Sequence, residues 1–311
     1  MSNKNISLII NTLNEMFNIS SDAEITIECN PDDINSEKIK FWKTNKINRV
    51  SLGIQSFDDG DLKLMNRSHN SQQALLSLDL IKKNFENYSI DLMYGIPNSS
   101  FDQWKKNLEI LTRNNIPHLS TYALTVEPKT ALKKLIENKK IDKISESNQR
   151  IQYDYTFKNL SALGYINYEF SSYSKPGYEC QNNLGYWDRK KYFGFGPSAH
   201  SFDGKKRKWN ISNNQLFQES IKNKQLPQKS EELVDKDIYN EIIMIGLRRS
   251  TGINIDKLKG MFNEKYINHF LREISPKIKQ GILVKKVNKI HTSENYKFMT
   301  DGIASDLFIT D

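Results

Sequence analysis

Three short segments of alternating apolar and polar residues between residues 23 and 97 constrain this fold more than any other feature. The alternation, which has the period of a β-strand, occurs in the segments AEITIECNP, RVSLGIQSF and YSIDLMYGIP. Helical-looking stretches separate these segments, and the resulting β-α-β-α-β order favours a parallel sheet. Each segment carries a polar residue near its end, namely Glu28, Gln55 and Asp91. Because parallel sheets gather functional groups at the carboxyl ends of their strands, we expect these side chains to converge on one cleft. Arg67 follows the second strand and is a fourth candidate.

The chain continues this pattern of strands and helices through its first two thirds. We expect a first helix at about residues 5–18 and strands over 49–55 and 118–125. Four further helices follow from apolar periodicity and start signals, over 36–44, 59–65, 71–85 and 98–113. Residues 130–164 look helical and polar. The sequence thus predicts an α/β fold in which residues 1–205 form an arc of a TIM-like (β/α) barrel.

A basic turn near residues 204–210 marks the expected domain boundary. Beyond it, residues 206–311 indicate helices over 240–248, 256–262 and 267–280, then strands in ILVKKV and YKFMT and a short final helix. Three helices followed by a pair of strands resemble a winged-helix unit. We therefore predict a small C-terminal, winged-helix-like domain whose wing is formed by those two strands.

Composition narrows the class of protein. The 311 residues carry a formal net charge of +8, yet the basic residues are scattered and only Lys205–Lys208 form a tight cluster. This charge fits either an anionic partner or a solvated lysine-rich surface. No apolar run is long enough to span a membrane, and the N-terminus lacks signal-peptide features, so we predict a cytoplasmic protein. Two distant cysteines exclude a disulfide framework and a cysteine-rich zinc site.

Several motifs resemble radical S-adenosylmethionine proteins of the oxygen-independent coproporphyrinogen III oxidase group, which includes heme chaperones. The resemblance is carried by IECNPDD, SLGIQSF with LMNRSHN, IDLMYGIP, HLSTYALTVEP, YEFSSYSKPGYECQNNLGYW, YFGFGPSAHSF and IGLRRSTG. It implies a radical S-adenosylmethionine barrel, a role in heme trafficking or porphyrin metabolism, and heme, porphyrin or a heme-receiving protein as partners. It also implies that Glu28, Gln55, Arg67 and Asp91 bind S-adenosylmethionine. The other interpretation is that these four residues cap helices and pair with one another at a barrel rim.

The sequence departs from this family at the iron–sulfur cluster. The family holds a [4Fe–4S] cluster on CxxxCxxC, followed by a GGGTP strand end, and neither motif occurs here. The two cysteines, Cys29 and Cys180, cannot supply three thiolate ligands. We therefore expect an N-terminally incomplete chain that lacks the first barrel strands. We assign no catalytic residue and no metal ligand.

Two positions bear on a heme ligand. His200 in PSAHSF fits either an axial ligand or a structural role, and heme chaperones of this type usually have His where Asn182 stands. An amide cannot replace imidazole on iron. Tyr186 and Trp187 offer flat surface for a macrocycle, although core packing explains them equally well.

Two other functions stay open. One is a non-catalytic module that binds heme or S-adenosylmethionine, which the absent cluster cysteines favour. The other is a winged-helix protein that binds nucleic acid. The region from Arg248 to Lys286 lacks a one-sided basic recognition helix, which argues against nucleic acid.

Overall fold

The computed structural model describes residues 1–310 and divides into two compact units, Met1–Glu179 and Cys180–Asp311. Each unit is described by itself. The boundary expected between residues 205 and 206 lies in the turn between β7 (His200–Phe202) and β8 (Lys206–Asn210), and that division stays a prediction. Among residues 1–310, no helix combines the length and the apolar character that crossing a bilayer requires.

The first unit is built on a six-stranded sheet with strand order β1-β2-β3-β4-β6-β5. Strands β1 to β4 pair in parallel, whereas β6 and β5 run antiparallel at the far end. The strands are β1 (Thr26–Cys29), β2 (Arg49–Gln55), β3 (Asn87–Tyr94), β4 (His118–Ala123), β5 (Ile166–Asn167) and β6 (Ser172–Ser174). The α/β class and the parallel order expected from the sequence are thus present.

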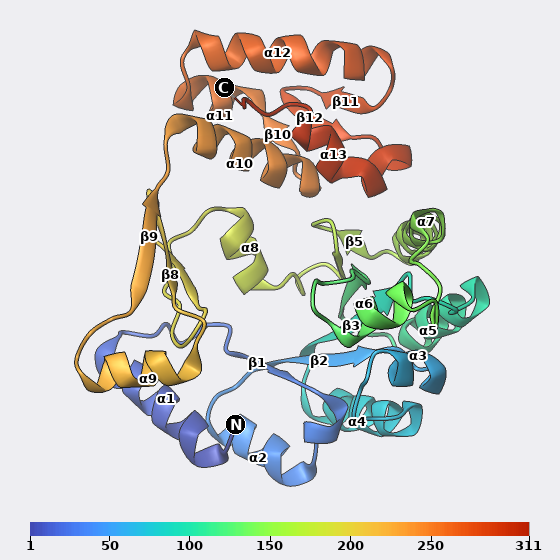
Figure 1. Ribbon diagram of the computed structural model, residues 1–311, viewed down its shortest axis with the longest axis vertical. Helices are drawn as coiled ribbons and strands as arrows, with labels where there is room; N and C mark the ends of the chain where they lie inside the picture. The colour runs from blue at the N-terminus through green and yellow to red at the C-terminus, as the bar shows by residue number, and fades with distance from the viewer. Residues whose placement is uncertain (311) are drawn as a thin grey trace. The chain divides into compact units, whose positions relative to one another are not determined.

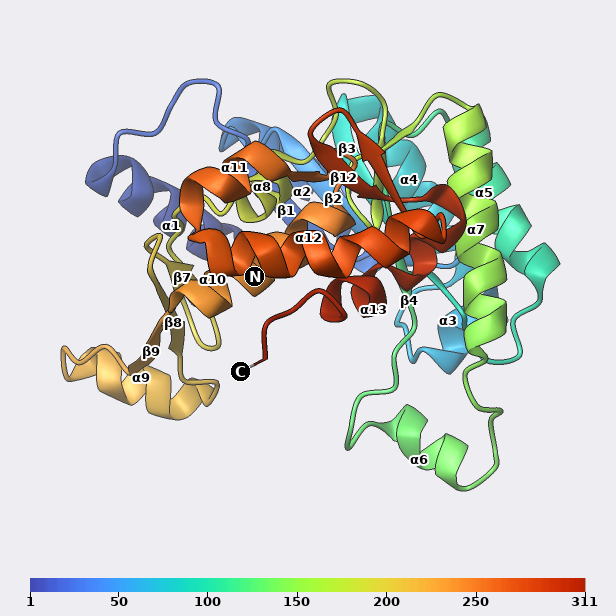
Figure 2. The ribbon, with the colours of Figure 1, turned by 90° about the horizontal axis from the view of Figure 1, so that it is seen from above.

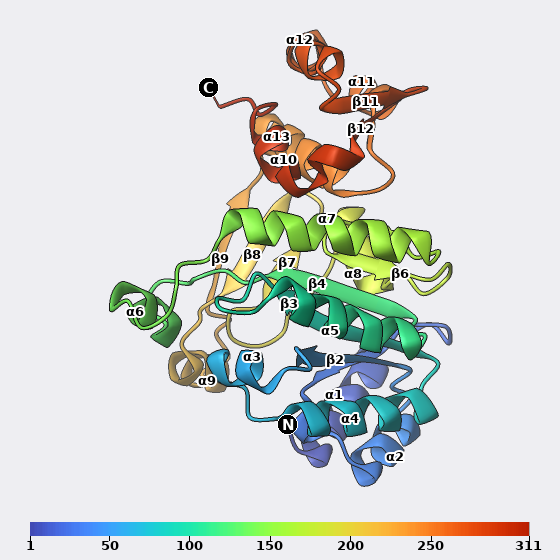
Figure 3. The ribbon, with the colours of Figure 1, turned by 90° about the vertical axis from the view of Figure 1, so that its right-hand side faces the viewer.

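Helices precede, connect and follow the parallel strands, and most of them cover one face of the sheet (Figure 3). They are α1 (Asn3–Met16), α2 (Ser36–Thr44), α3 (Asp59–Leu64), α4 (Ser71–Asn84), α5 (Phe101–Arg113), α6 (Ala131–Glu137) and α7 (Glu146–Ala162). In Figure 3, α4, α5 and α7 follow one another across this face. Helix α6 stands apart from them, on the long connection between β4 and α7 (Figure 2). The sequence-based bounds of α2 and β2 match those of the structure.

Every second residue of the parallel strands points toward the helices and is buried beneath them. Leu52, Ile54, Ile90 and Leu92 are completely buried there. Tyr94 extends the layer, with its ring centroid 5.7 Å from that of Trp104 on α5 and 6.4 Å from that of Tyr153 on α7. The Trp104 indole N–H donates to Thr156 Oγ1 at 2.9 Å, so its buried polar atom is satisfied.

The N-termini of these helices follow the expected start signals. Asn70 and Gln73 form a capping box at α4, and Ser100 and Gln103 form another at α5. In each, two backbone N–H groups that a helix leaves free gain a side-chain acceptor. Helix α2 begins at the expected residue with Asn35 as its cap, and Pro31–Asp33 before it forms a separate 3₁₀ turn.

The second unit contains two three-stranded sheets, β7-β8-β9 and β10-β12-β11. Figure 1 shows the β8–β9 ribbon with α9 at one end. Its elements are α8 (Gln181–Trp187), β7, β8, α9 (Asn214–Lys222), β9 (Gln228–Glu232), α10 (Asp235–Arg248), β10 (Ile253–Asn254), α11 (Ile255–Met261), α12 (Glu264–Lys279), β11 (Leu283–Lys286), β12 (Lys289–Thr292) and α13 (Thr300–Ser305).

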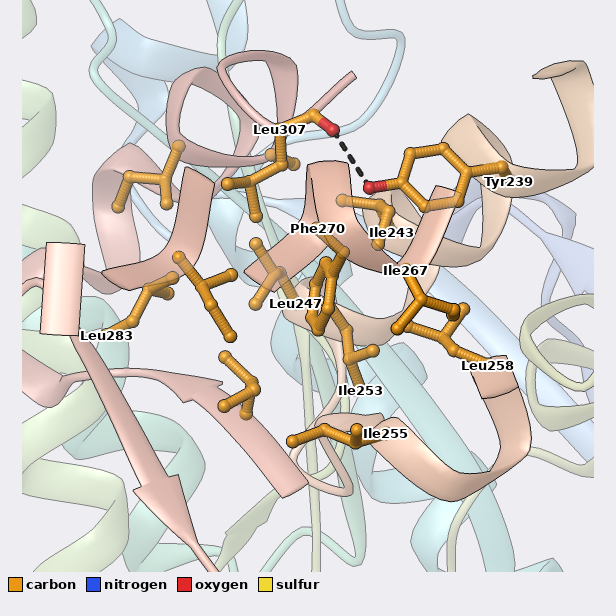
Figure 4. Packing of buried hydrophobic residues seen from close by; sticks show 14 residues of the cluster. Tyr239, Ile243, Leu247, Ile253, Ile255, Leu258, Ile267, Phe270, Leu283 and Leu307 are labelled. Atoms are coloured by element: carbon orange, nitrogen blue, oxygen red, sulfur yellow. Dashed lines mark hydrogen bonds between the residues drawn. The ribbon is translucent and has the colours of Figure 1, made fainter. Parts of the chain in front are cut away.

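An apolar core holds the C-terminal elements together (Figure 4). Tyr239 and Ile243 on α10 and Phe270 on α12 are completely buried in this cluster. The Tyr239 hydroxyl donates to the Leu307 carbonyl at 3.3 Å, which ties α10 to the segment after α13. The three expected helices of this region are all present.

The predicted wing strand YKFMT is wrong. Residues Glu294–Met299 form a 3₁₀ helix, and the partner of β11 is β12, four residues that immediately follow a tight turn. Val287 in that turn has a φ of 55°, a conformation rare for a β-branched residue. The sequence reasoning missed this hairpin because no glycine or Asn-Gly pair marks the turn.

Candidate functional site

The sheet face opposite the helices is polar. Its positions are the alternate residues that do not face the helices, among them Arg49, Ser51, Ser89, Asp91 and His118. TIM-like barrels usually fill this inner side with branched apolar side chains. A buried polar face of this kind is expensive unless its groups bind one another or a ligand. The site is therefore best sought here.

Asp91 on β3 is the centre of this face. Its carboxylate lies 3.3 Å from Ser51 Oγ on β2 and 3.5 Å from Ser89 Oγ on its own strand, and the register sets Ser120 of β4 beside it. Burial raises the pKa of Asp91 to about 6, and the hydroxyls of Ser120 and Ser51 oppose that rise. Asp91 is thus a desolvated carboxylate with neutral donors around it, and within residues 1–310 it forms no ion pair with a basic side chain.

Glu28 joins Asp91 through the register of the strands. Glu28 on β1 lies opposite Ser51 on β2, and Ser51 contacts Asp91. The negative charge of Glu28 contributes to the raised pKa of Asp91, so the two carboxylates are close enough to interact electrostatically. Unlike Asp91, Glu28 is exposed and open to a ligand.

Gln55 and Arg67 form a second cluster around Gly53 of β2. Arg67 Nη2 donates to the Gly53 carbonyl at 3.1 Å and to Asn30 Oδ1 at 2.6 Å. A side chain at Gly53 would approach Gln55 Nε2 to 3.1 Å and Asn30 Oδ1 to 3.5 Å. Because glycine has no side chain, the side chains of Gln55 and Asn30 can both approach the backbone of β2 at this position.

Two polar atoms of this cluster are left over. Within residues 1–310, Gln55 Oε1 and Arg67 Nε are buried and have no hydrogen-bond partner. Gln55 also ends β2 with a φ of 69°, a left-handed conformation that turns its side chain away from the regular alternation. A buried acceptor and a buried donor without partners are suited to receive a polar ligand.

The structure brings the four predicted residues together in two pairs on one sheet face. Glu28 and Asp91 meet around Ser51, and Gln55 and Arg67 meet around Gly53, two residues further along β2. Sequence reasoning missed the intervening groups: Asn30, Ser51, Ser89, His118 and Ser120. The four strand residues among them occupy the polar positions of the alternating pattern in their strands, and this pattern could have identified them.

Cys29 is not part of this arrangement. It faces away from Glu28, with its Sγ 3.7 Å from the Ser51 carbonyl oxygen. Burial, followed by the negative charges of Asp33 and Asp91, raises the pKa of the Cys29 thiol to about 12.

The second unit holds an aromatic cavity of about 530 Å³. Two of its arginines, Arg189 and Arg207, are each 3.0 Å from a carboxylate oxygen of Glu241. Its other lining side chains include Tyr186, Trp187, Tyr192, Phe202, Met244 and Phe308. His200 does not line this cavity; it is exposed and stacks on Trp209 with a centroid distance of 6.3 Å.

Known proteins resemble the chain in both sequence and fold. Residues 3–111 match the model of the radical SAM superfamily. The chain is 30% identical over 303 residues to the heme chaperone HemW of Bacillus subtilis, an alignment that covers 96% of this chain and 78% of the relative. It is 28% identical over 295 residues to HemW of Lactococcus lactis, with 94% and 78% covered.

A solved structure extends the likeness to the fold. Coproporphyrinogen III oxidase (HemN) from Escherichia coli, a radical SAM enzyme, matches 99% of this chain and 75% of its own length, with a TM-score of 0.83. Its sequence identity of 18% makes this a statement about the fold alone. The similarity to the Bacillus protein covers nearly the whole chain, and on that ground the chain belongs to the HemW family of radical SAM proteins.

Proposed function

We propose that this chain binds S-adenosylmethionine on the polar inner face of its first unit and acts in heme trafficking or porphyrin metabolism. Membership of the radical SAM superfamily implies S-adenosylmethionine as a ligand. The observation that carries the proposal is the arrangement of Glu28 and Asp91 on either side of Ser51, and of Gln55 and Arg67 around Gly53 of β2. In this proposal the sheet is an arc of a radical SAM barrel in the cytoplasm, and α10 to β12 form a winged-helix-like unit.

The chemistry of the four residues fits this ligand. S-adenosylmethionine carries a positive sulfonium, an ammonium, a carboxylate and ribose hydroxyls. Glu28 and Asp91 supply acceptors for the ammonium and the hydroxyls, and Arg67 supplies a donor for the carboxylate. The unpartnered amide oxygen of Gln55 adds an acceptor that needs no rearrangement.

The residues of this chain do not fit the family's [4Fe–4S] cluster. A radical SAM cluster needs three thiolates, and the sequence contains two cysteines. Cys29 is a half-buried thiol with its pKa raised to about 12, and Cys180 belongs to the other unit. The proposed role of these residues is accordingly to bind and orient the ligand.

Calorimetric titration with S-adenosylmethionine tests the proposal. Asp91→Ala removes a charged partner of the ligand, and we expect the affinity to fall at least tenfold, since hydrogen bonds to charged groups contribute about 1.5–3 kcal/mol. Asp79→Ala, an exposed carboxylate on α4, is the matched control and should leave the affinity unchanged. Unaltered affinity in folded Asp91→Ala protein contradicts the assignment.

The neutral analogue S-adenosylhomocysteine sharpens this test. It lacks the sulfonium charge but keeps the adenosine, ribose and amino-acid groups. Because two carboxylates face one guanidinium among the four residues, we expect weaker binding of the analogue. Equal affinities would show that the carboxylates do not recognise the sulfonium charge.

Heme binding in the aromatic cavity of the second unit is a second candidate function. The flat side chains of Tyr186, Trp187 and Phe202 suit a macrocycle, and Nη2 of Arg189, which is buried and has no hydrogen-bond partner within residues 1–310, suits one of its carboxylates. Titration with hemin should shift the Soret band, and Trp187→Ala should weaken binding.

Replacing histidines identifies an iron ligand if one exists. His200→Ala is compared with His291→Ala, a half-buried histidine of the same unit. Loss of the Soret shift in the first variant alone would make His200 the ligand. If neither variant alters the spectrum, the cavity binds heme without histidine from these positions.

Nucleic-acid binding receives little support from the second unit. The charges along α12 are of both signs, and several basic side chains are already paired. Arg272 contacts Glu273 at 2.8 Å, and Lys277 contacts Asp306 at 2.6 Å. A phosphate-binding surface would instead present unpaired basic residues on one side.

A further inference from the structure

A chain of buried polar groups leads from Asp91 to the opposite end of the inner face. Ser89 Oγ is 3.5 Å from Asp91 Oδ1 and 2.8 Å from His118 Nδ1. His118 Nε2 is in turn 2.7 Å from the hydroxyl oxygen of Tyr168. Ser89, His118 and Tyr168 are at most 4% exposed, so water does not compete for these contacts.

The direction of these hydrogen bonds depends on which nitrogen of His118 carries the proton. Burial, followed by the charge of Arg49, lowers the pKa of His118 to about 3, so the ring is neutral and has one N–H. With that proton on Nδ1, His118 donates to Ser89, and the single Ser89 proton is directed to Asp91. Nε2 is then an acceptor for the Tyr168 hydroxyl. With the proton on Nε2, the Ser89 hydroxyl must donate to Nδ1 of His118. It then has no proton left to donate to Asp91.

We propose that His118 is a positioning residue, which fixes the carboxylate of Asp91 through Ser89 by carrying its proton on Nδ1. The inference rests on the proposed function, in which Asp91 contacts S-adenosylmethionine. Ser51 and Ser120 lie beside the same carboxylate from the two neighbouring strands. A carboxylate held by hydroxyls from three strands keeps one orientation, so less freedom is lost when the ligand binds.

Two replacements of His118 separate positioning from packing. His118→Asn places an amide N–H near the former Nδ1 and keeps a donor for Ser89. His118→Gln carries its amide further, toward the former Nε2, and leaves Ser89 without that donor. Both are smaller and more flexible than imidazole, so loss of packing alone affects them similarly.

The matched control for the serine is Ser174, which lies opposite His118 in the strand register. Its Oγ is buried and has no hydrogen-bond partner within residues 1–310. Ser89→Ala and Ser174→Ala therefore remove the same buried hydroxyl, but only the first removes a contact to Asp91 and His118.

The experiment combines ¹⁵N NMR of the histidine rings with calorimetric titration of S-adenosylmethionine. We expect the Nδ1–H tautomer for His118, about a tenfold loss of affinity in Ser89→Ala and His118→Gln, and less than about a threefold loss in Ser174→Ala and His118→Asn. Circular dichroism confirms that each variant is folded, and Ser89→Ala decides the question if neither His118 variant folds.

Distinct results overturn the inference and the proposed function. An Nε2–H tautomer, or equal affinities of Ser89→Ala and Ser174→Ala, overturns the role of His118 while Asp91→Ala still abolishes binding. Absence of binding in the unaltered chain, or unchanged binding in Asp91→Ala, overturns the proposed function and the positioning role with it.

Discussion

The buried carboxylate of Asp91 should make the first unit less stable than it would be with an amide. Its pKa is raised from 3.8 to about 6 by burial. The difference of about 2, at 1.36 kcal/mol for each pKa unit, means that ionised Asp91 lowers the free energy of unfolding by about 3 kcal/mol. Asp91→Asn keeps the shape and removes the charge. We therefore expect this variant to be about 3 kcal/mol more stable at pH 7.

The sign of the pH dependence follows from the direction of the pKa shift. Between about pH 4 and pH 6 the folded state binds more protons at Asp91 than the unfolded state does, so stability falls as pH rises. Below pH 4 the carboxyl is protonated in both states, and its penalty disappears. The advantage of Asp91→Asn should thus be close to zero at pH 4, grow up to pH 6 and remain constant above it.

Native-state hydrogen exchange provides the assay, because peptides that cover β2 and β3 report on the first unit separately from the second. Asp79→Asn, an exposed control on α4, should change the free energy of opening by less than about 0.5 kcal/mol at every pH. If Asp91→Asn is no more stable than the unaltered chain at pH 7, or if its advantage does not depend on pH, then Asp91 is not a desolvated carboxylate.

Two further predictions concern the backbone and the C-terminal core. Gly95→Ala should destabilise the first unit by more than about 2 kcal/mol in urea unfolding, because its φ is 72° and a Cβ would lie 2.2 Å from Gln149 Cγ. Gly177→Ala, with a φ of 86° and no neighbour within 4 Å, carries only the backbone strain of about 1 kcal/mol; equal losses would refute the clash. Tyr239→Phe should lower the free energy of unfolding of the second unit by about 1 kcal/mol, because the Leu307 carbonyl loses its buried donor. Unchanged thermal stability of that unit would show that the bond contributes nothing.

The sequence was most informative where local periodicity decides the structure. Helix α2 and strand β2 could be predicted to the residue, because caps and alternation are properties of a few consecutive side chains. The three-residue strand β6 could not, because its position is fixed by antiparallel pairing with β4, more than 50 residues earlier. The β7-β8-β9 sheet was missed because its short strands carry no clear alternation.

The site was predictable in its residues but not in its contacts. Alternation and strand ends identified Glu28, Gln55 and Asp91, and the position after the second strand added Arg67. The family resemblance then implied a shared ligand for all four. The register between strands decides the rest: Ser89 reaches His118 only because β3 and β4 pair them directly. A shift of one residue would place His118 on the helix-covered face. No pattern within a single strand contains that information.

Burial links the stability of this fold to its proposed ligand. The desolvation that raises the pKa of Asp91 also lowers the local dielectric constant, so a cation placed beside the carboxylate is attracted more strongly than it would be in water. A ligand with a positive charge would relieve the same penalty that Asp91→Asn removes. Asp91→Asn should therefore be more stable and should bind the ligand more weakly. If Asp91 took no part in binding, the same replacement would change the stability and leave the affinity unchanged. Measuring both quantities on one variant thus separates a binding site from a merely polar interior.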